Sequence, residues 1–378
     1  MHILFLHNNF PGQFKWLVKH YATSGAEITF VSMFAATRDD NVRHIVSKNP
    51  SEHPDKLTHF FHHALRKLSQ KFTPDVIISH SGFNCGLYAK YYFPTVPVIS
   101  YLEWWFSSFA ARNFQDTEFF SCTSDLSSKL HLRNAPLSLE LSQADLIICP
   151  TSFQAESLPN IFRTKLRVIF DGVPIRKLPP NHIRKNFILY ASRGLEPMRC
   201  YPEFIKSIPH LRQLGLNAPI LILGSDSVHY GVGRTKKQPS SFKKWAEAYL
   251  SENNVRDVHH LGKLPFAKYL KTLSTCRLHV HITQPFVPSW SLLDSMSFCS
   301  PILASQNSFT KQLFSVSSNL TLTTNVFNSH KLASDIYRSY QTADESTIKS
   351  PYSSFTDLFS LSSCLRQWID SINSLTLN

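Results

Sequence analysis

Two arginines stand directly after a predicted strand and have the chemistry to bind a diphosphate. Arg193 and Arg199 follow the apolar run 187–191, lie six residues apart, and are separated by a loop that Gly194 and Pro197 shape. Negative charge that develops on a departing diphosphate is stabilised by positive charge that is already in position. We expect the two guanidinium groups to supply that charge. The alternative is a pair of solvated arginines on a surface loop.

A predicted helix that begins near Ser289, Trp290 and Ser291 offers a second group suited to phosphate. The first backbone N–H groups of a helix and the positive end of its dipole stabilise bound phosphate oxygens. Ser289 is suited to cap the helix, and Asp294 stands one turn further on. The alternative for Asp294 is a carboxylate that only interacts favourably with the helix dipole.

The N-terminal half contains two further candidate positions. Gly12, in the turn Pro11-Gly12-Gln13, would allow the backbone to approach a ligand closely, although an ordinary helix-start turn also explains it. Glu103 closes the predicted strand 96–101, where a polar side chain can reach a ligand. The alternative is a salt-bridged glutamate on the surface.

No metal site is predicted. His279 and His281 share one face of the predicted strand 278–282, and this spacing can hold a metal, but no third ligand is evident, which favours a structural role. The seven cysteines are an odd number, are widely spaced and include no C-x-x-C pair, so we expect reduced thiols.

Length and composition indicate a soluble two-domain protein. A chain of 378 residues exceeds the usual size of one domain, and no apolar run approaches the roughly 20 residues of a membrane-spanning helix. The short apolar run 3–6 has no basic leader, so it predicts a buried strand rather than a secretory signal. We expect a cytoplasmic location.

The positive charge points to anionic partners. The chain has 39 Lys and Arg residues against 26 Asp and Glu residues, and a net charge of +13. Such a balance attracts nucleotides, nucleic acid or the anionic inner face of a membrane, where the protein would bind peripherally. A basic cluster that would contact an acidic acceptor or lipid head groups, or form a solvated face, comprises Arg234, Lys236, Lys237, Lys243 and Lys244.

The order of apolar runs and amphipathic stretches predicts the fold class. Short, fully apolar strands that alternate with helices are typical of parallel sheets covered on both faces. A Pro-rich basic segment at residues 174–185 is suited to connect two such domains. The fold class is therefore α/β, with two Rossmann-like, doubly wound parallel sheets facing a central cleft. Strands are predicted at 2–6, 28–32, 75–79, 96–101, 145–149 and 167–170, and then at 187–191, 220–223, 259–261, 278–282 and 302–304.

Three segments together resemble a group within glycosyltransferase family four. They are residues 7–14 (HNNFPGQF), 192–199 (SRGLEPMR) and 285–296 (PFVPSWSLLDSM), and they occur in the order of the family's loop, phosphate and donor motifs. The resemblance implies the GT-B fold, transfer with retention and a nucleotide-sugar donor without metal. It also implies an acceptor-side domain at 1–172, a donor-binding domain at 173–340, and helices within 341–378 that pack back on the first domain.

The same resemblance assigns roles to the candidate residues. Arg193 and Arg199 would hold the diphosphate, and Asp294 would bind the donor ribose where the family has the last glutamate of its E-x7-E motif. Glu103 lies close to where many relatives have an active-site histidine, and would orient the acceptor hydroxyl or the donor sugar. The first glutamate of the motif is replaced by Phe286, which removes one contact with the donor sugar.

The predicted function is therefore transfer of a sugar from a UDP- or GDP-sugar to a hydroxyl of a glycan, a lipid-linked or another acceptor. Trp104 and Trp105 beside Glu103 would stack on a sugar ring or belong to the core. Two alternatives stay open. The replacement at Phe286 allows a non-catalytic nucleotide-sugar-binding homologue or subunit, and the net charge allows a protein that binds or modifies nucleic acid, although no nucleic-acid-binding motif is present.

Overall fold

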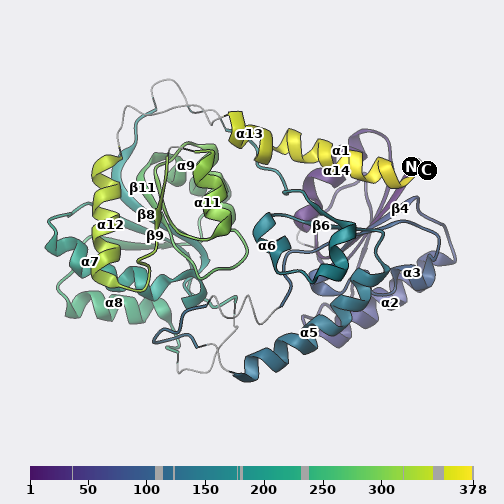
Figure 1. Ribbon diagram of the computed structural model, residues 1–378, viewed down its shortest axis with the longest axis horizontal. Coiled ribbons are helices and arrows are strands. Elements are labelled where there is room, and N and C mark those ends of the chain that lie inside the picture. Colours follow the sequence, from purple (N-terminus) through teal and green to yellow (C-terminus); the bar gives the residue numbers. More distant parts are fainter. Residues whose placement is uncertain are drawn as a thin grey trace. The chain divides into compact units, whose positions relative to one another are not determined.

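The protein forms two compact units in a computed structural model (Figure 1). Unit 1 comprises Met1–Ser107, Ser128–Gly172 and Leu358–Asn378, and unit 2 comprises Ser108–Ser127 and Val173–Asp357. For residues 124–130 and 353 only the backbone is described. The structure describes residues 1–35, 37–106, 114–121, 124–176, 178, 182–230, 238–317, 319–343 and 353–376.

A parallel sheet forms the centre of unit 1. In the described residues its strand order is β3-β2-β1-β4-β5-β6-β7, and each neighbouring pair is parallel. Because alternate side chains of a strand point to opposite faces, Ile3 and Phe5 pack on one face and Leu4 and Leu6 on the other. The strands are β1 (His2–Phe10), β2 (Glu27–Ala35), β3 (Arg43–Val46), β4 (Val76–His80), β5 (Val98–Tyr101), β6 (Leu146–Cys149) and β7 (Leu166–Val168).

Helices cover both faces of this sheet. The face of Phe5 packs against α1 (Lys15–Thr23) and α14 (Leu361–Thr376), and the opposite face packs against α2 (Pro54–Ser69) and α3 (Ala89–Tyr92). Unit 1 also contains α5 (Ser124–Gln143), α6 (Ser152–Glu156), η1 (Gly12–Phe14), η2 (Ser81–Phe83) and η3 (Asn160–Lys165).

Unit 2 repeats this architecture with a different sequence. Its described strands are parallel and have the order β10-β9-β8-β11-β12-β13. They are β8 (Lys185–Gly194), β9 (Ile220–Ser225), β10 (Val258–Gly262), β11 (Cys276–His281), β12 (Ile302–Ser305) and β13 (Leu320–Thr323).

The helices of unit 2 also lie on both faces of its sheet. One face packs against α7 (Tyr201–Gln213), α8 (Phe242–Glu252) and α12 (Ser329–Thr342), and the other against α9 (Phe266–Thr275). The remaining helices are η4 (Pro197–Arg199), α10 (Trp290–Ser297), α11 (Ser308–Ser315) and α13 (Ser353–Phe359), the last of which extends into unit 1.

The predicted α/β class with two parallel sheets is confirmed, and the differences concern single elements. Strands β3 and β13, each at one edge of a sheet, were not predicted. The six cysteines that the structure describes are free and buried, whereas Cys122 lies outside the described residues, as do Arg234, Lys236 and Lys237. Among the described helices, none is both long and apolar enough to cross a membrane.

Removing the Trp368 ring tests whether α14 completes the core of unit 1. Trp368 is 4% exposed, and its ring stacks on Tyr101 at 6.1 Å between centroids. We expect Trp368→Ala to lower the free energy of unfolding by about 3–5 kcal/mol, because a large cavity is left in the core. The exposed neighbour Gln367 provides the control, and Gln367→Ala should change stability by less than about 0.5 kcal/mol in the same denaturant titration. Equal effects of the two variants would contradict this packing role.

Candidate active site

The two predicted diphosphate-binding arginines lie at the carboxyl end of β8. The strand extends to Gly194, so Arg193 belongs to the strand and does not follow it. The Arg193 side chain is exposed. Arg199 ends η4 and is only 5% exposed. A Cβ atom at Gly194 would lie 2.3 Å from the carbonyl oxygen of Ser227, so only glycine allows these two loops to approach. Both arginines therefore lie at one edge of the sheet, where the Arg199 side chain is packed and the Arg193 side chain is exposed.

Arg199 is held between a loop and two aromatic rings. Its Nη1 donates to Thr283 Oγ1 at 3.4 Å and to the carbonyl of Val287 at 3.3 Å. The guanidinium lies 5.0 Å from the ring of Tyr230 and 6.0 Å from that of Phe286. Aromatic faces attract a cation without cancelling its charge, whereas a carboxylate at position 286 would form an ion pair with it. At position 286 the charge of Arg199 thus faces an aromatic ring instead of a carboxylate.

Glu196, which the sequence did not single out, fixes the loop that carries Tyr230. Its Oε2 accepts hydrogen bonds from the backbone N–H groups of His229 at 2.6 Å and Tyr230 at 2.9 Å. Glu196 is fully buried, and burial raises its pKa, although these bonds and the charges of Arg199 and Arg193 oppose the rise. The position of Glu196 between the two arginines of SRGLEPMR is the sequence feature from which it could have been recognised. Glu196 therefore joins the arginine turn to the loop that covers Arg199.

Helix α10 begins with the predicted cap. The side chain of Ser289 accepts from the backbone N–H of Ser291 at 3.4 Å. Ser291 is buried, and its hydroxyl donates to the carbonyl of Ala191 at 3.1 Å, which fastens the start of α10 to β8. Trp290 is 45% exposed. Ser291 thus positions the helix start through its side chain, and Trp290 presents an exposed indole beside it.

Asp294 lies further along α10, and two side chains of the protein already donate hydrogen bonds to its carboxylate. Its Oδ1 accepts from Arg176 Nη1 at 2.7 Å, and its Oδ2 accepts from the Tyr269 hydroxyl at 3.1 Å. The side chain is nearly buried, and burial raises its pKa against the opposing effect of Arg176. A carboxylate has about four lone-pair sites, so these two donors do not use all of its accepting capacity. Arg176 lies in the predicted connector and was not recognised from the sequence.

The two histidines of β11 have structural roles. Both are buried, and burial lowers the pKa of His279 to about 3 and that of His281 well below its ordinary value. His279 Nδ1 lies 2.7 Å from Ser295 Oγ, which links β11 to α10. Within the described residues, no group of three or more His, Cys, Asp or Glu side chains has a geometry suited to a metal ion.

In unit 1, Glu103 lies beyond the end of β5 and contacts two neighbouring elements. Its Oε1 accepts from Gln13 Nε2 at 2.8 Å, and its Oε2 lies 3.4 Å from His80 Nε2. Burial raises the pKa of Glu103, but the nearby His80 ring and the hydrogen bond from Gln13 outweigh it, so the net shift is downward. Glu103 is therefore ionised at neutral pH, and its contact with His80 is compatible with the salt-bridged surface glutamate of the alternative as well as with a ligand-binding role.

A second carboxyl group near Glu103, that of Asp171, has a raised rather than a lowered pKa. The hydroxyl of Tyr101 donates to Asp171 Oδ1 at 2.6 Å. Burial raises the pKa of Asp171 to about 7, and the charge of Glu103 adds to the rise, while the Tyr101 bond opposes it. Two carboxyl groups with separated pKa values thus lie at the same edge of the unit 1 sheet.

The tryptophans beside Glu103 belong mainly to the core. Trp104 and Trp105 are each 8% exposed. Trp105 packs against Phe162 at 5.9 Å between ring centroids, and Trp104 lies 5.9 Å from Phe153. This burial favours the core interpretation over a sugar-stacking surface.

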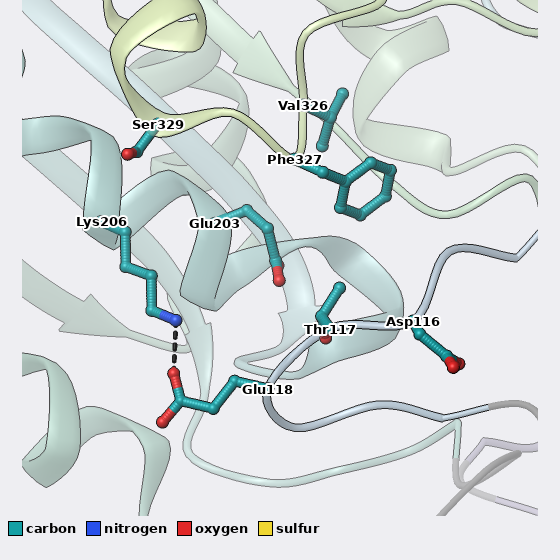
Figure 2. A pocket seen from close by; sticks show the side chains of 8 residues that line it. All are labelled: Asp116, Thr117, Glu118, Glu203, Lys206, Val326, Phe327 and Ser329. Carbon is teal, nitrogen blue, oxygen red and sulfur yellow. Dashed lines mark hydrogen bonds and ion pairs between the residues drawn. The ribbon is translucent and has the colours of Figure 1, made fainter.

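Unit 2 also contains an acidic pocket, defined by its lining residues (Figure 2). Glu203 in the first turn of α7 is only 8% exposed, and its Oε2 has no hydrogen-bond partner in the described part of the chain. Lys206 forms an ion pair with Glu118 at the same pocket, and Figure 2 shows the Glu203 carboxyl turned toward Thr117. Burial raises the pKa of Glu203 to about 7. The acidic pocket is lined by Asp116, Thr117, Glu118, Glu203, Lys206, Val326, Phe327 and Ser329.

The raised pKa of Glu203 predicts how stability depends on pH. The folded state keeps a proton on Glu203 up to about pH 7, whereas the unfolded chain releases it near the ordinary pKa of 4.5, so stability falls as pH rises between these values. Glu203→Gln removes this loss. We expect the variant to be more stable than the wild type at pH 8 by roughly 1–3 kcal/mol, with little difference at pH 4, in thermal unfolding. The exposed Glu252→Gln is the control, and a pH-independent effect of Glu203→Gln would contradict the prediction.

The fold and these residues can be compared with known proteins. A family model described as "Glycosyl transferase family 4 group" matches residues 31–178, whereas no curated protein matches the sequence significantly. Sucrose-phosphate synthase from Thermosynechococcus elongatus is similar in structure with a TM-score of 0.73 and 14% identity, covering 100% of this chain and 99% of that one.

Two further solved structures are similar over nearly the whole chain. Anabaena HepE in complex with UDP and glucose has a TM-score of 0.67 and 15% identity, covering 99% of this chain and 100% of that one. The lipopolysaccharide outer core galactosyltransferase WaaB has a TM-score of 0.61 and 14% identity, covering 99% of both chains.

These similarities confirm that the protein has the GT-B fold, with two parallel-sheet α/β domains. The family match over residues 31–178 confirms the predicted resemblance to a group within glycosyltransferase family four.

Proposed function

We propose that the protein transfers a hexosyl group from a nucleoside-diphosphate sugar to an acceptor hydroxyl, with retention of the anomeric configuration. The observation that carries this proposal is the arginine turn at the end of β8. Arg193 is exposed there, and Arg199 is buried with aromatic rings rather than a carboxylate on it. A diphosphate is the ligand class that such a pair of neighbouring arginines suits. The UDP bound to HepE supports UDP-sugars as the first donors to test.

The chemistry requires negative charge to be stabilised on the donor side. The bond between the anomeric carbon and the phosphate oxygen breaks, and its electron pair stays on the diphosphate. The acceptor hydroxyl oxygen bonds to the same carbon and gives its proton to a base. We assign Arg193, Arg199 and the start of α10 at Ser289, Trp290 and Ser291 to the diphosphate, because cations and helix N-termini stabilise the charge that grows there.

Asp294 is assigned to the donor ribose. Arg176 and Tyr269 orient its carboxylate from the sides they occupy, and the remaining lone pairs accept the ribose hydroxyls. Glu103 is assigned to the acceptor side, where it accepts a hydrogen bond from a sugar hydroxyl. Gly12 is assigned to the turn that approaches the donor and the acceptor, in addition to its packing against His7. The acceptor is a glycan, a lipid-linked or another hydroxyl compound, and no metal is assigned to the site.

A panel of nucleotides tests the donor class. We expect UDP or its sugar conjugates to raise the melting temperature and to give a calorimetric binding signal, without added metal, more strongly than GDP or ADP. The same panel should then be run with magnesium. Binding without turnover against a broad set of acceptors would favour the non-catalytic homologue that the replacement at Phe286 suggests. The absence of any nucleotide binding would contradict the proposed function.

Two arginine variants test the diphosphate assignment. Arg193→Ala and Arg199→Lys should each weaken nucleoside-diphosphate binding about 10- to 100-fold, because each removes charge-assisted hydrogen bonds of roughly 1.5–3 kcal/mol. Lysine at position 199 keeps the charge but loses the planar contacts. The control is Arg256→Ala, which removes an exposed arginine just before β10, at the opposite edge of the sheet. Unchanged affinity in both site variants by calorimetry would exclude these residues from the diphosphate site.

Retention is tested on the product. Once a donor and acceptor are found, we expect proton NMR during the first turnovers to show the anomeric configuration of the donor in the new glycosidic bond. A product of the opposite configuration would contradict the retaining mechanism while leaving the glycosyltransferase assignment intact.

A further inference from the structure

A continuous set of hydrogen bonds leads from the backbone of β1 to Glu103. It includes His7 on β1, Gln13 in η1 and Glu103 beyond β5, and His80 at the end of β4 contacts Glu103 from the other side. These elements end at the same edge of the unit 1 sheet because their strands are parallel. We call these four residues the Glu103 network. Glu103 is its exposed acidic member, with 30% of its side chain exposed, whereas His7 and His80 are each 1% exposed.

The direction of each hydrogen bond follows from the chemistry of its ends. An ionised carboxylate can only accept, so the Nε2 group of Gln13 donates to Glu103. The Oε1 atom of Gln13 then faces His7 Nε2 at 2.6 Å, and that nitrogen must carry the proton. His7 Nδ1 accepts from the backbone N–H of Asn9 at 2.8 Å. A backbone N–H cannot reverse its role, so the orientation of the whole chain of bonds is fixed.

The state of His7 agrees with this direction. Burial lowers the pKa of His7 far below its ordinary value, and the neighbouring His80 lowers it further. A neutral imidazole with its proton on Nε2 is the form that the two bonds require. His7 therefore acts as a fixed donor to Gln13 rather than as a titrating group.

Gly12 allows this arrangement to form. A Cβ atom at Gly12 would lie 2.4 Å from the His7 ring, and the residue has a φ of +54°. Any other residue would push η1 away from His7 and would displace Gln13. The turn Pro11-Gly12-Gln13 is thus explained by packing within unit 1.

The remaining contacts of Glu103 restrict it further. The backbone carbonyl of Glu103 accepts from Gln154 Nε2 at 2.7 Å, and the Gln154 side chain is in turn held by the Thr151 hydroxyl. His80 packs against the rings of Phe83 and Tyr101. In the described structure no hydrogen-bond partner satisfies either ring nitrogen of His80, although Nε2 lies 3.4 Å from Glu103. His80 is therefore aimed at the carboxylate and has capacity to bind it more tightly.

We propose that Gln13, oriented by His7, and His80 are positioning residues that hold the Glu103 carboxylate in one orientation as the acceptor for a sugar hydroxyl. This inference rests on the proposed function. It assigns the acceptor-side specificity to an anionic group, which binds hydroxyl donors and repels anionic substituents such as phosphate or carboxylate. The substrate group that meets Glu103 is therefore a neutral hydroxyl.

The first test does not depend on activity. Nitrogen-15 NMR of the histidine rings reports which nitrogen carries the proton, and the His7→Asn variant assigns the His7 signals. We expect the Nε2-protonated neutral form of His7 over the whole range from about pH 5.5 to 8.5. A His7 ring that titrates in this range, or that carries its proton on Nδ1, would overturn the network even if the protein proves to be a glycosyltransferase.

The second test measures the pH dependence of kcat in Gln13→Met, which keeps the length of the side chain but removes its donor. Loss of one bond to the carboxylate makes Glu103 easier to protonate. We expect the acidic limb of the kcat profile to move upward by about half to one pH unit, so that kcat falls roughly 3- to 10-fold at pH values on that limb and hardly changes at pH 7. The donor KM should change less than about threefold, because Gln13 acts through Glu103.

The other ionisable groups around Glu103 must be accounted for in this profile. They are His80 of β4, His7 of β1, Tyr101 of β5, Asp171 and, behind His80, Glu140 of α5. The Asp171→Asn variant identifies any limb of the kcat profile that is due to Asp171. Gln70→Met is the matched control at an exposed position of unit 1.

An acidic limb that does not move in Gln13→Met overturns the positioning role. A wild-type protein without turnover on any donor defeats the proposed function instead, and the NMR result still stands.

Discussion

Parallel pairing of the strands is the constraint on which the candidate site depends. In both units each described pair of neighbouring strands is parallel, so the loops that leave their carboxyl ends gather at one edge of each sheet. Polar side chains that are far apart in the sequence come together there, such as His7, His80 and Glu103 in unit 1. The apolar strands supply no chemistry themselves, but they fix the positions from which these side chains extend.

The two edges have opposite electrostatic character. In unit 2, Arg193 and Arg199 provide positive charge, and the rings of Tyr230 and Phe286 cover one guanidinium without neutralising it. In unit 1, neighbouring donors keep Glu103 ionised, whereas burial and the negative charge of Glu103 favour the protonated form of Asp171. A cationic edge suits the diphosphate of a donor, and an edge with one ionised carboxyl group and one whose pKa is about 7 suits hydroxyl groups.

Sequence patterns predicted the fold class and the arginine turn because both depend on local order along the chain. Apolar runs identified the central strands, but β3 (Arg43–Val46) and β13 (Leu320–Thr323) were missed because each is short and contains polar residues beside its apolar ones. The contacts of Arg176 with Asp294, and of Gln13 with Glu103, join residues 118 and 90 positions apart. No local pattern encodes such a pair. At position 286 the sequence revealed that the family's glutamate is replaced by phenylalanine. It did not reveal that the Phe286 ring packs against the Arg199 guanidinium.

The route of the chain through the two units affects how the protein can fold during synthesis. Unit 1 includes Met1–Ser107 but also Leu358–Asn378, and Trp368 and Ile372 of α14 lie in the same core as Phe5 and Phe30. Domains generally fold as units once their residues are available. The ribosome releases the strands of the first sheet long before the helix that covers one of its faces. All described segments of unit 2 thus precede α14 in the chain, and the apolar face that packs against α14 must stay soluble until α14 has been synthesised.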